Sequence, residues 1–167
     1  MWALLTVMAT STNAVAQGLA LFWLLVLAGV LRPAHLQRSK LMKLWPHSLE
    51  GQCTADKKRI DGKRRAFLWR APRISLLGTD FGEQAFNFWI KATGGELSFF
   101  LPDTAPKGSG LDAKAWSNGP MGQSKIRSLT NVFFEAITKR KPEATTRALF
   151  GKEGIAYPGT PHEVCAR

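Results

Sequence analysis

The sequence predicts a mainly α-helical protein with one N-terminal transmembrane helix, followed by a basic linker and a small irregular region with two amphipathic helices and long loops. Three observations lead to this prediction: an uncharged apolar run at the N-terminus, a concentration of cations directly after it, and two later segments in which apolar residues recur with a helical period. The 167 residues therefore divide into residues 1–31, 32–75 and 76–167.

The transmembrane prediction rests on residues 1–31, which contain no Asp, Glu, Lys, Arg or His. A helix over about 14–31, AVAQGLALFWLLVLAGVL, rises about 1.5 Å per residue and would extend roughly 27 Å, close to the roughly 30 Å hydrocarbon core of a bilayer. Pro33 lacks the amide that a continuing helix needs and biases Arg32 away from helical geometry. We therefore expect the helix to stop at the cationic boundary.

Two other interpretations of the same segment remain open. Residues 14–16, AVA, resemble the cleavage site of a secretory signal or of the first part of a bipartite organelle presequence, although no Lys or Arg precedes them. A buried core helix is the other alternative. For a single-pass membrane protein, the cations on the C-terminal side place the C-terminal part in the cytoplasm, stroma or matrix.

A basic belt occupies residues 32–75, which hold 12 Lys+Arg against 3 acidic residues, a net charge of +9. Residues 76–167 hold 11 Lys+Arg against 9 acidic residues and are close to balanced. Because the belt follows the predicted transmembrane helix directly, we expect it to bind anionic lipid head groups. The cations assigned to this membrane surface are Arg32, Arg38, Lys40, Lys43, Lys57, Lys58, Arg59, Lys63, Arg64 and Arg65.

Within the belt, residues 35–45 predict a short, irregular amphipathic helix at head-group depth. Residues 46–75 sustain neither a helical nor a strand period and predict an extended, poorly ordered linker. Arg65, Trp69 and Arg70 could stack on single-stranded nucleic acid, but the recognition patterns of known nucleic-acid modules are absent. Nucleic acid is therefore not the expected partner.

The first amphipathic helix of the distal region is marked at both ends. Asp80 and Glu83 have the spacing of a capping box, and Gly94-Gly95 closes the segment. The apolar residues between them recur at helical spacing and predict about three turns with an aromatic stripe. Residues 96–103 form a short apolar run, which predicts one strand or an anchoring loop.

A Pro/Gly-rich strap at residues 102–123 separates this helix from a second one at about 124–141, with a further short helix at 143–150. Two helices and one apolar run give a thin core for this region, so some aromatic side chains are expected to contact a partner rather than complete the fold. The residues assigned to partner docking are Phe88, Trp89, Trp116 and Phe133.

The sequence contains no pattern that names a reaction, so we expect no catalytic residue, no metal site and no cofactor. Cys53 and Cys165 lack metal-ligand spacing and do not indicate a disulfide framework. His35 lies just beyond the predicted transmembrane helix and is conceivable as an axial ligand to haem or chlorophyll, but a solvated interfacial histidine is the favoured interpretation.

These features favour a non-enzymatic, single-pass membrane accessory subunit that docks on a larger, energy-transducing membrane complex in an organelle or bacterium. One alternative is a small soluble protein imported into an organelle, with its first 70 or so residues acting as a bipartite presequence. Another is a membrane-tethered, basic nucleic-acid-binding protein. A chance reading frame is a last alternative, because tryptophan-rich, basic composition without motifs also arises without selection.

Overall fold

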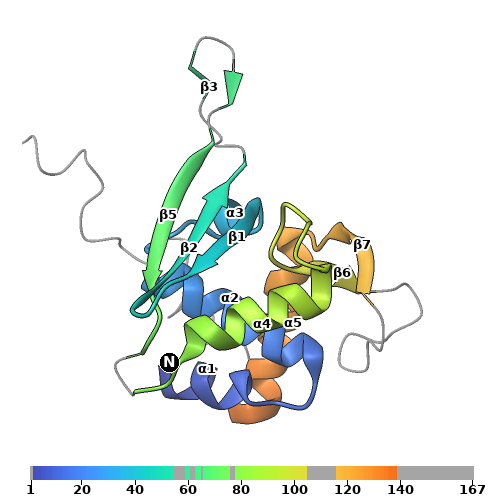
Figure 1. Cartoon of the computed structure of the whole chain (residues 1–167). Coiled ribbons are helices and arrows are strands. Elements are labelled where there is room, and N and C mark those ends of the chain that lie inside the picture. Colours follow the sequence, from blue (N-terminus) through green and yellow to red (C-terminus); the bar gives the residue numbers. More distant parts are fainter. Residues whose placement is uncertain are drawn as a thin grey trace, which may run out of the picture. The chain divides into compact units, whose positions relative to one another are not determined.

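A computed structural model describes residues 2–54, 59–60, 63–64, 66–75, 78–104 and 116–138 (Figure 1). The chain divides into two units, Met1–Ile126 and Arg127–Arg167. The helices are α1 (Trp2–Ala9), α2 (Ala14–Ala28), α3 (Pro33–Leu36), α4 (Phe81–Thr93) and α5 (Gln123–Thr138). The strands are β1 (Ser39–Leu44), β2 (Ser48–Cys53), β3 (Arg59–Ile60), β4 (Lys63–Arg64), β5 (Phe67–Pro72), β6 (Pro102–Thr104) and β7 (Trp116–Pro120).

The described residues combine helices with antiparallel strands, so the prediction of a mainly α fold is wrong. The strands form one three-stranded sheet in the order β1-β2-β5 and two pairs, β3-β4 and β6-β7. Residues 39–72, which were expected to form an amphipathic helix and an unstructured linker, supply the whole of the three-stranded sheet and the first of these pairs.

The prediction of a transmembrane helix at about 14–31 is also wrong, and with it the single-pass topology. No helix in the described part of the chain is long and apolar enough to cross a membrane. The N-terminal apolar segment is divided into α1 and α2 by a turn. Asn13 ends this turn, and its Oδ1 accepts hydrogen bonds of 3.0 Å from the amides of Val15 and Ala16, which is the geometry of a helix N-cap.

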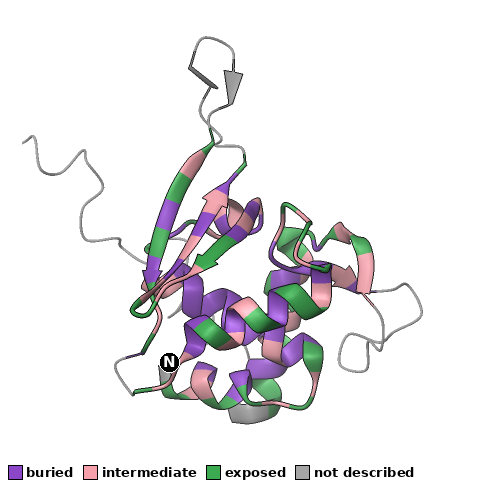
Figure 2. Ribbon diagram, viewed as in Figure 1, coloured by how far each residue is buried: buried purple, intermediate pink, exposed green. Residues whose placement is uncertain are grey.

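Helix α2 is apolar on every side, and neighbouring elements of the first unit bury it. Leu19 to Val26 are all buried, and α2 packs on α1, α4 and β5 (Figure 2). Phe22 lies 6.2 Å from the ring of Phe100. A helix that is hydrophobic on every side is expected in a protein core as well as in a membrane. The buried core helix, one of the alternatives for this segment, is therefore the arrangement that the structure contains.

The three-stranded sheet has an inner and an outer face. Along β2, buried residues alternate with partly exposed residues (Figure 2). Along β5, the buried residues Trp69 and Ala71 alternate with exposed residues. Gly51 of β2 lies opposite Trp69 of β5, and Glu50 lies opposite Arg70. A Cβ on Gly51 would lie 2.3 Å from Trp69 Cζ2, so the indole occupies the space where any larger side chain would stand. The Trp69 indole also donates a 2.9 Å hydrogen bond to Ser39 Oγ.

Helix α4 confirms the prediction for residues 80–93. The Asp80 side chain accepts a 2.9 Å hydrogen bond from the Glu83 amide, and Gly94 closes the helix with a φ of 69°, a left-handed conformation that glycine adopts without strain. Arg73 donates hydrogen bonds of 2.6 Å to the carboxylates of both Asp80 and Glu83. The hydrogen bond to Asp80 raises the pKa of the Arg73 guanidinium, which forms ion pairs with both carboxylates.

The described part of the predicted strap contains secondary structure. Strands β6 and β7 pair antiparallel, with Pro102 opposite Pro120. Buried Gln37 connects this region to α3, because its side-chain amide donates to the carbonyls of Leu101 (2.6 Å) and Met121 (2.9 Å) and accepts from the Leu101 amide (3.0 Å). Residues 105–115 lie outside the described part of the chain.

Helix α5 confirms the second predicted amphipathic helix over Gln123–Thr138. The predicted continuation through residues 139–141 and the short helix at 143–150 fall outside the described residues.

Candidate functional site

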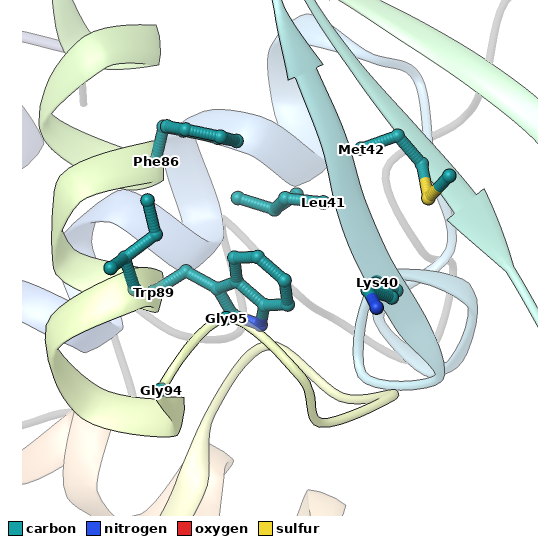
Figure 3. Close-up of a pocket in the computed structure, with 8 residues that line it drawn as sticks. Lys40, Leu41, Met42, Phe86, Trp89, Gly94 and Gly95 are labelled. Atoms are coloured by element: carbon teal, nitrogen blue, oxygen red, sulfur yellow. The ribbon is translucent and has the colours of Figure 1, made fainter.

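A groove between strand β1 and helix α4 is the candidate functional site of the first unit. Its volume is about 400 Å³. Figure 3 shows Leu41 on β1 pointing toward Phe86 and Trp89 of α4, so that apolar side chains from two elements meet along the groove. We call it the docking groove, and it is lined by Lys40, Leu41, Met42, Phe86, Trp89, Ile90, Gly94 and Gly95.

The floor and the rim of the docking groove differ in exposure. Leu41 and Trp89 are buried and belong to the core, and the Trp89 indole is fixed by a 2.9 Å hydrogen bond to the Phe99 carbonyl. At the rim, Ile90 is 44% exposed. The Met42 side chain is 47% exposed and lies on the other side of β1 from Leu41, Phe86 and Trp89 (Figure 3). A buried apolar floor with an exposed apolar side chain beside it is typical of a surface that gains stability when a partner covers it.

Strand β1 adds a main-chain edge to the docking groove. It is the first strand in the order β1-β2-β5, so among the described strands only β2 pairs with it. The register shifts between Leu41 and Lys43, which marks a bulge at Met42. The bulge limits regular pairing at this edge to a few residues, and it leaves the two successive residues Met42 and Lys43 exposed.

The docking groove contains one ionisable side chain, Lys40, and no carboxylate. Lys43 and Lys91 are exposed on the same two elements. No group of three or more His, Cys, Asp or Glu side chains that could hold a metal ion occurs among the described residues. The chemistry of the groove is therefore that of an apolar recess with positive charge beside it.

The outer face of the sheet carries a second cluster of charged and aromatic side chains. Lys43 Nζ lies 3.6 Å from the centroid of the Trp45 ring, and the Arg70 guanidinium lies 5.6 Å from the same ring. Arg70 also pairs with Glu50 at 2.7 Å. Cation–π contacts of this kind hold the cations against the sheet while their charge stays accessible to solvent.

The structure distributes the predicted lipid-binding cations over several elements. Arg32 is exposed before α3, and Arg38 donates a 2.9 Å hydrogen bond to the Ala34 carbonyl. Lys40 lines the docking groove, and Lys43 stands on the outer face of the sheet. Three others belong to the paired strands β3 and β4, namely Arg59, Lys63 and Arg64. The remaining three lie outside the described residues: Lys57, Lys58 and Arg65.

The predicted docking aromatics are largely interior side chains. Phe88 is buried, 5.9 Å from the rings of both Phe100 and Trp116, and Trp89 is the floor of the docking groove. Trp116 itself is half-buried. Phe133 is a buried residue of α5. Of these residues only Trp89 lines the groove, together with neighbours that the sequence did not single out.

Two further residues from the sequence analysis have structural partners. The His35 ring packs edge-on against Phe67, with 5.1 Å between the ring centroids. Trp69, which was considered for stacking on nucleic acid, is a buried residue of the inner sheet face.

Four groove side chains were not assigned to a site by the sequence analysis: Leu41, Met42, Phe86 and Ile90. The signal for Ile90 was available, because this large apolar residue lies off the buried stripe of a helix that was correctly predicted. Met42 gave no such signal, since it lies on a strand whose residues were predicted to form a helix. Comparisons of the chain with models of protein families, with curated proteins and with solved structures found no match.

Proposed function

We propose that this chain is a non-enzymatic accessory protein that binds a partner protein by accepting an extended segment of that partner in the docking groove. The observation that carries the proposal is the position of the groove along the edge of β1. An extended segment at such an edge can pair with the main chain of β1 while its side chains enter the recess beside it. The proposal keeps the accessory role predicted from the sequence and drops the transmembrane helix.

The lining of the groove defines what the segment must contain. The apolar floor of Leu41 and Trp89 and the exposed Ile90 at the rim favour a large aliphatic or aromatic side chain. Lys40 lines the groove, and none of the lining residues is a carboxylate. Acidic residues on either side of the apolar one would therefore be attracted, and basic residues would be repelled.

The experiment is selection of extended peptides of about ten residues from a random library on the full-length chain, followed by measurement of their affinity by fluorescence polarisation. We expect the selected peptides to share an apolar residue flanked by Asp or Glu. Ile90→Glu places a charge on the rim of the groove, so it should weaken their binding about tenfold or more, a loss of about 1.4 kcal/mol.

A matched control is Val132→Glu, which introduces the same charge at a helical residue of similar exposure, 41% against 44% for Ile90. Val132 belongs to α5 and does not line the groove. Peptide affinity unchanged by Val132→Glu and lowered by Ile90→Glu supports the proposal. Peptides without the apolar-acidic pattern, or equal effects of the two substitutions, would show that the groove is not the docking site.

A further inference from the structure

We infer that the outer face of the three-stranded sheet is a membrane-binding face, which rests on the surface of an anionic phospholipid bilayer without crossing it. The inference does not depend on the proposed function, and this face shares only Met42 with the docking groove. The membrane-binding face is defined by exposed or partly exposed residues of β1, β5 and the turn after β1, namely Met42, Lys43, Trp45, Leu68 and Arg70.

The positive charge of this face is only partly neutralised within the fold. Glu50 of β2 lies between two cations, because it is opposite Lys43 on one side and opposite Arg70 on the other. Arg70 pairs with Glu50 at 2.7 Å. The Lys43 ammonium instead lies 3.6 Å from the centroid of the Trp45 ring and forms no ion pair with a described residue. The charge of Lys43 therefore remains available for an anion from outside the chain.

Apolar side chains accompany these cations on the membrane-binding face. Leu68 is 63% exposed and, as an alternate residue of β5, shares the outer face with Arg70 (Figure 2). Met42 is 47% exposed and lies on the side of β1 away from Leu41 (Figure 3). The indole nitrogen of Trp45 has no hydrogen-bond acceptor in the described part of the chain. Exposed aliphatic side chains beside tryptophan and cations are typical of surfaces that meet lipid head groups.

These observations favour a lipid surface over the other polyanions that a basic protein can bind. Single-stranded nucleic acid stacks its bases on free aromatic rings, and Lys43 covers one face of the Trp45 ring. An acidic peptide would satisfy the cations, but its charges give no reason for Leu68 to be exposed next to them. An anionic bilayer offers phosphate and carboxylate groups together with hydrocarbon, so it matches both the charged and the apolar side chains.

The test measures how the full-length chain partitions onto sedimented phospholipid vesicles at about 150 mM salt. One set of vesicles is phosphatidylcholine alone, and the other contains about 30% phosphatidylserine. Two pairs of variants are compared. Leu68→Glu and Val7→Glu introduce the same charge at residues that are 63% and 65% exposed. Lys43→Gln and Lys91→Gln remove the same charge from exposed lysines, one on the sheet and one on α4.

We expect Leu68→Glu to lower the partition coefficient for anionic vesicles about tenfold or more, because the new carboxylate is repelled by the head groups and cannot enter hydrocarbon. Lys43→Gln should lower the coefficient about fivefold, which corresponds to about 1 kcal/mol. Val7→Glu and Lys91→Gln should each change it less than about twofold, since charges away from the contact are screened by salt.

Equal losses within either pair would overturn the inference, because they would show that only the net charge of the chain matters. Equal binding to the two kinds of vesicle would also overturn it, as would tighter binding of the unsubstituted chain to single-stranded RNA or to polyglutamate than to anionic vesicles. Urea unfolding establishes that each variant is folded. If Leu68→Glu does not fold, Leu68→Ala replaces it, with an expected loss of about fivefold against no change for Val7→Ala.

Discussion

Helix α2 and the sheet β1-β2-β5 bury their side chains in different ways. From Leu19 to Val26, α2 has no exposed side chain, whereas along β2 and β5 every buried residue is followed by a more exposed one. The difference separates two tasks. The inner residues of both elements contribute the apolar burial that stabilises the fold, whereas the outer face of the sheet carries partly or fully exposed side chains.

The largest effect is expected from Phe22→Ala on α2. Phe22 is fully buried beside Trp23 and Phe100, so its removal leaves a cavity and should lower the free energy of unfolding by about 3 to 5 kcal/mol. Urea unfolding measures this change. Leu68→Ala is the matched control on the outer face of the sheet, where Leu68 is 63% exposed, and should change stability by less than about 0.5 kcal/mol. A loss of unfolding free energy for Leu68→Ala close to that for Phe22→Ala would mean that side chains on the outer face of the sheet are packed as tightly as those of the core.

An intermediate effect is expected where the inner face of the sheet is most closely packed. Gly51→Ala adds a methyl group at 2.3 Å from Trp69 Cζ2, and the buried indole cannot move without losing its hydrogen bond to Ser39. We expect a loss of about 1 to 3 kcal/mol in thermal or urea unfolding. Gly122→Ala is the control, because no heavy atom lies within 4 Å of its added Cβ. Equal stability of the two variants would show that the inner face tolerates overpacking.

The smallest effect is expected from Arg70→Gln on the outer face. The side chain of Arg70 is 64% exposed, and its ion pair with Glu50 is screened by solvent. The free energy of unfolding should fall by less than about 1 kcal/mol, and the difference from the unsubstituted chain should shrink as salt is added. A salt-independent loss above about 2 kcal/mol would assign Arg70 a structural role. The outer face of the sheet would then contribute to stability as the inner face does.

The sequence predicted some elements well because their signals are local. Asp80, Glu83 and Gly94 define the two ends of α4, and each acts within one turn of the helix. The apolar run after Ala14 correctly indicated a helix, but it indicated the wrong environment. Hydrophobicity alone does not distinguish lipid from a protein interior, and the run ends after 15 helical residues at a glycine.

The sheet and the docking groove were missed for a different reason. The inner residues of β2 are Leu49, Gly51 and Cys53, and two of these are too small to produce a visible alternation of apolar and polar residues. The structure requires a glycine at position 51 because the Trp69 indole fills the space beside it. The groove depends on packing between β1 and α4, which lie about forty residues apart in the chain, and no local pattern reports such a contact.

The burial of α2 by α4 also has a consequence for how the chain is made. Phe88, which closes over Gly18 of α2, is translated long after the apolar helix has been synthesised. At roughly 5 to 20 residues per second, the delay is on the order of 3 to 15 s. During that interval the side of α2 that α4 covers in the folded chain has no α4 to pack on, so the packing of α2 can be completed only after residues 81–93 have been synthesised.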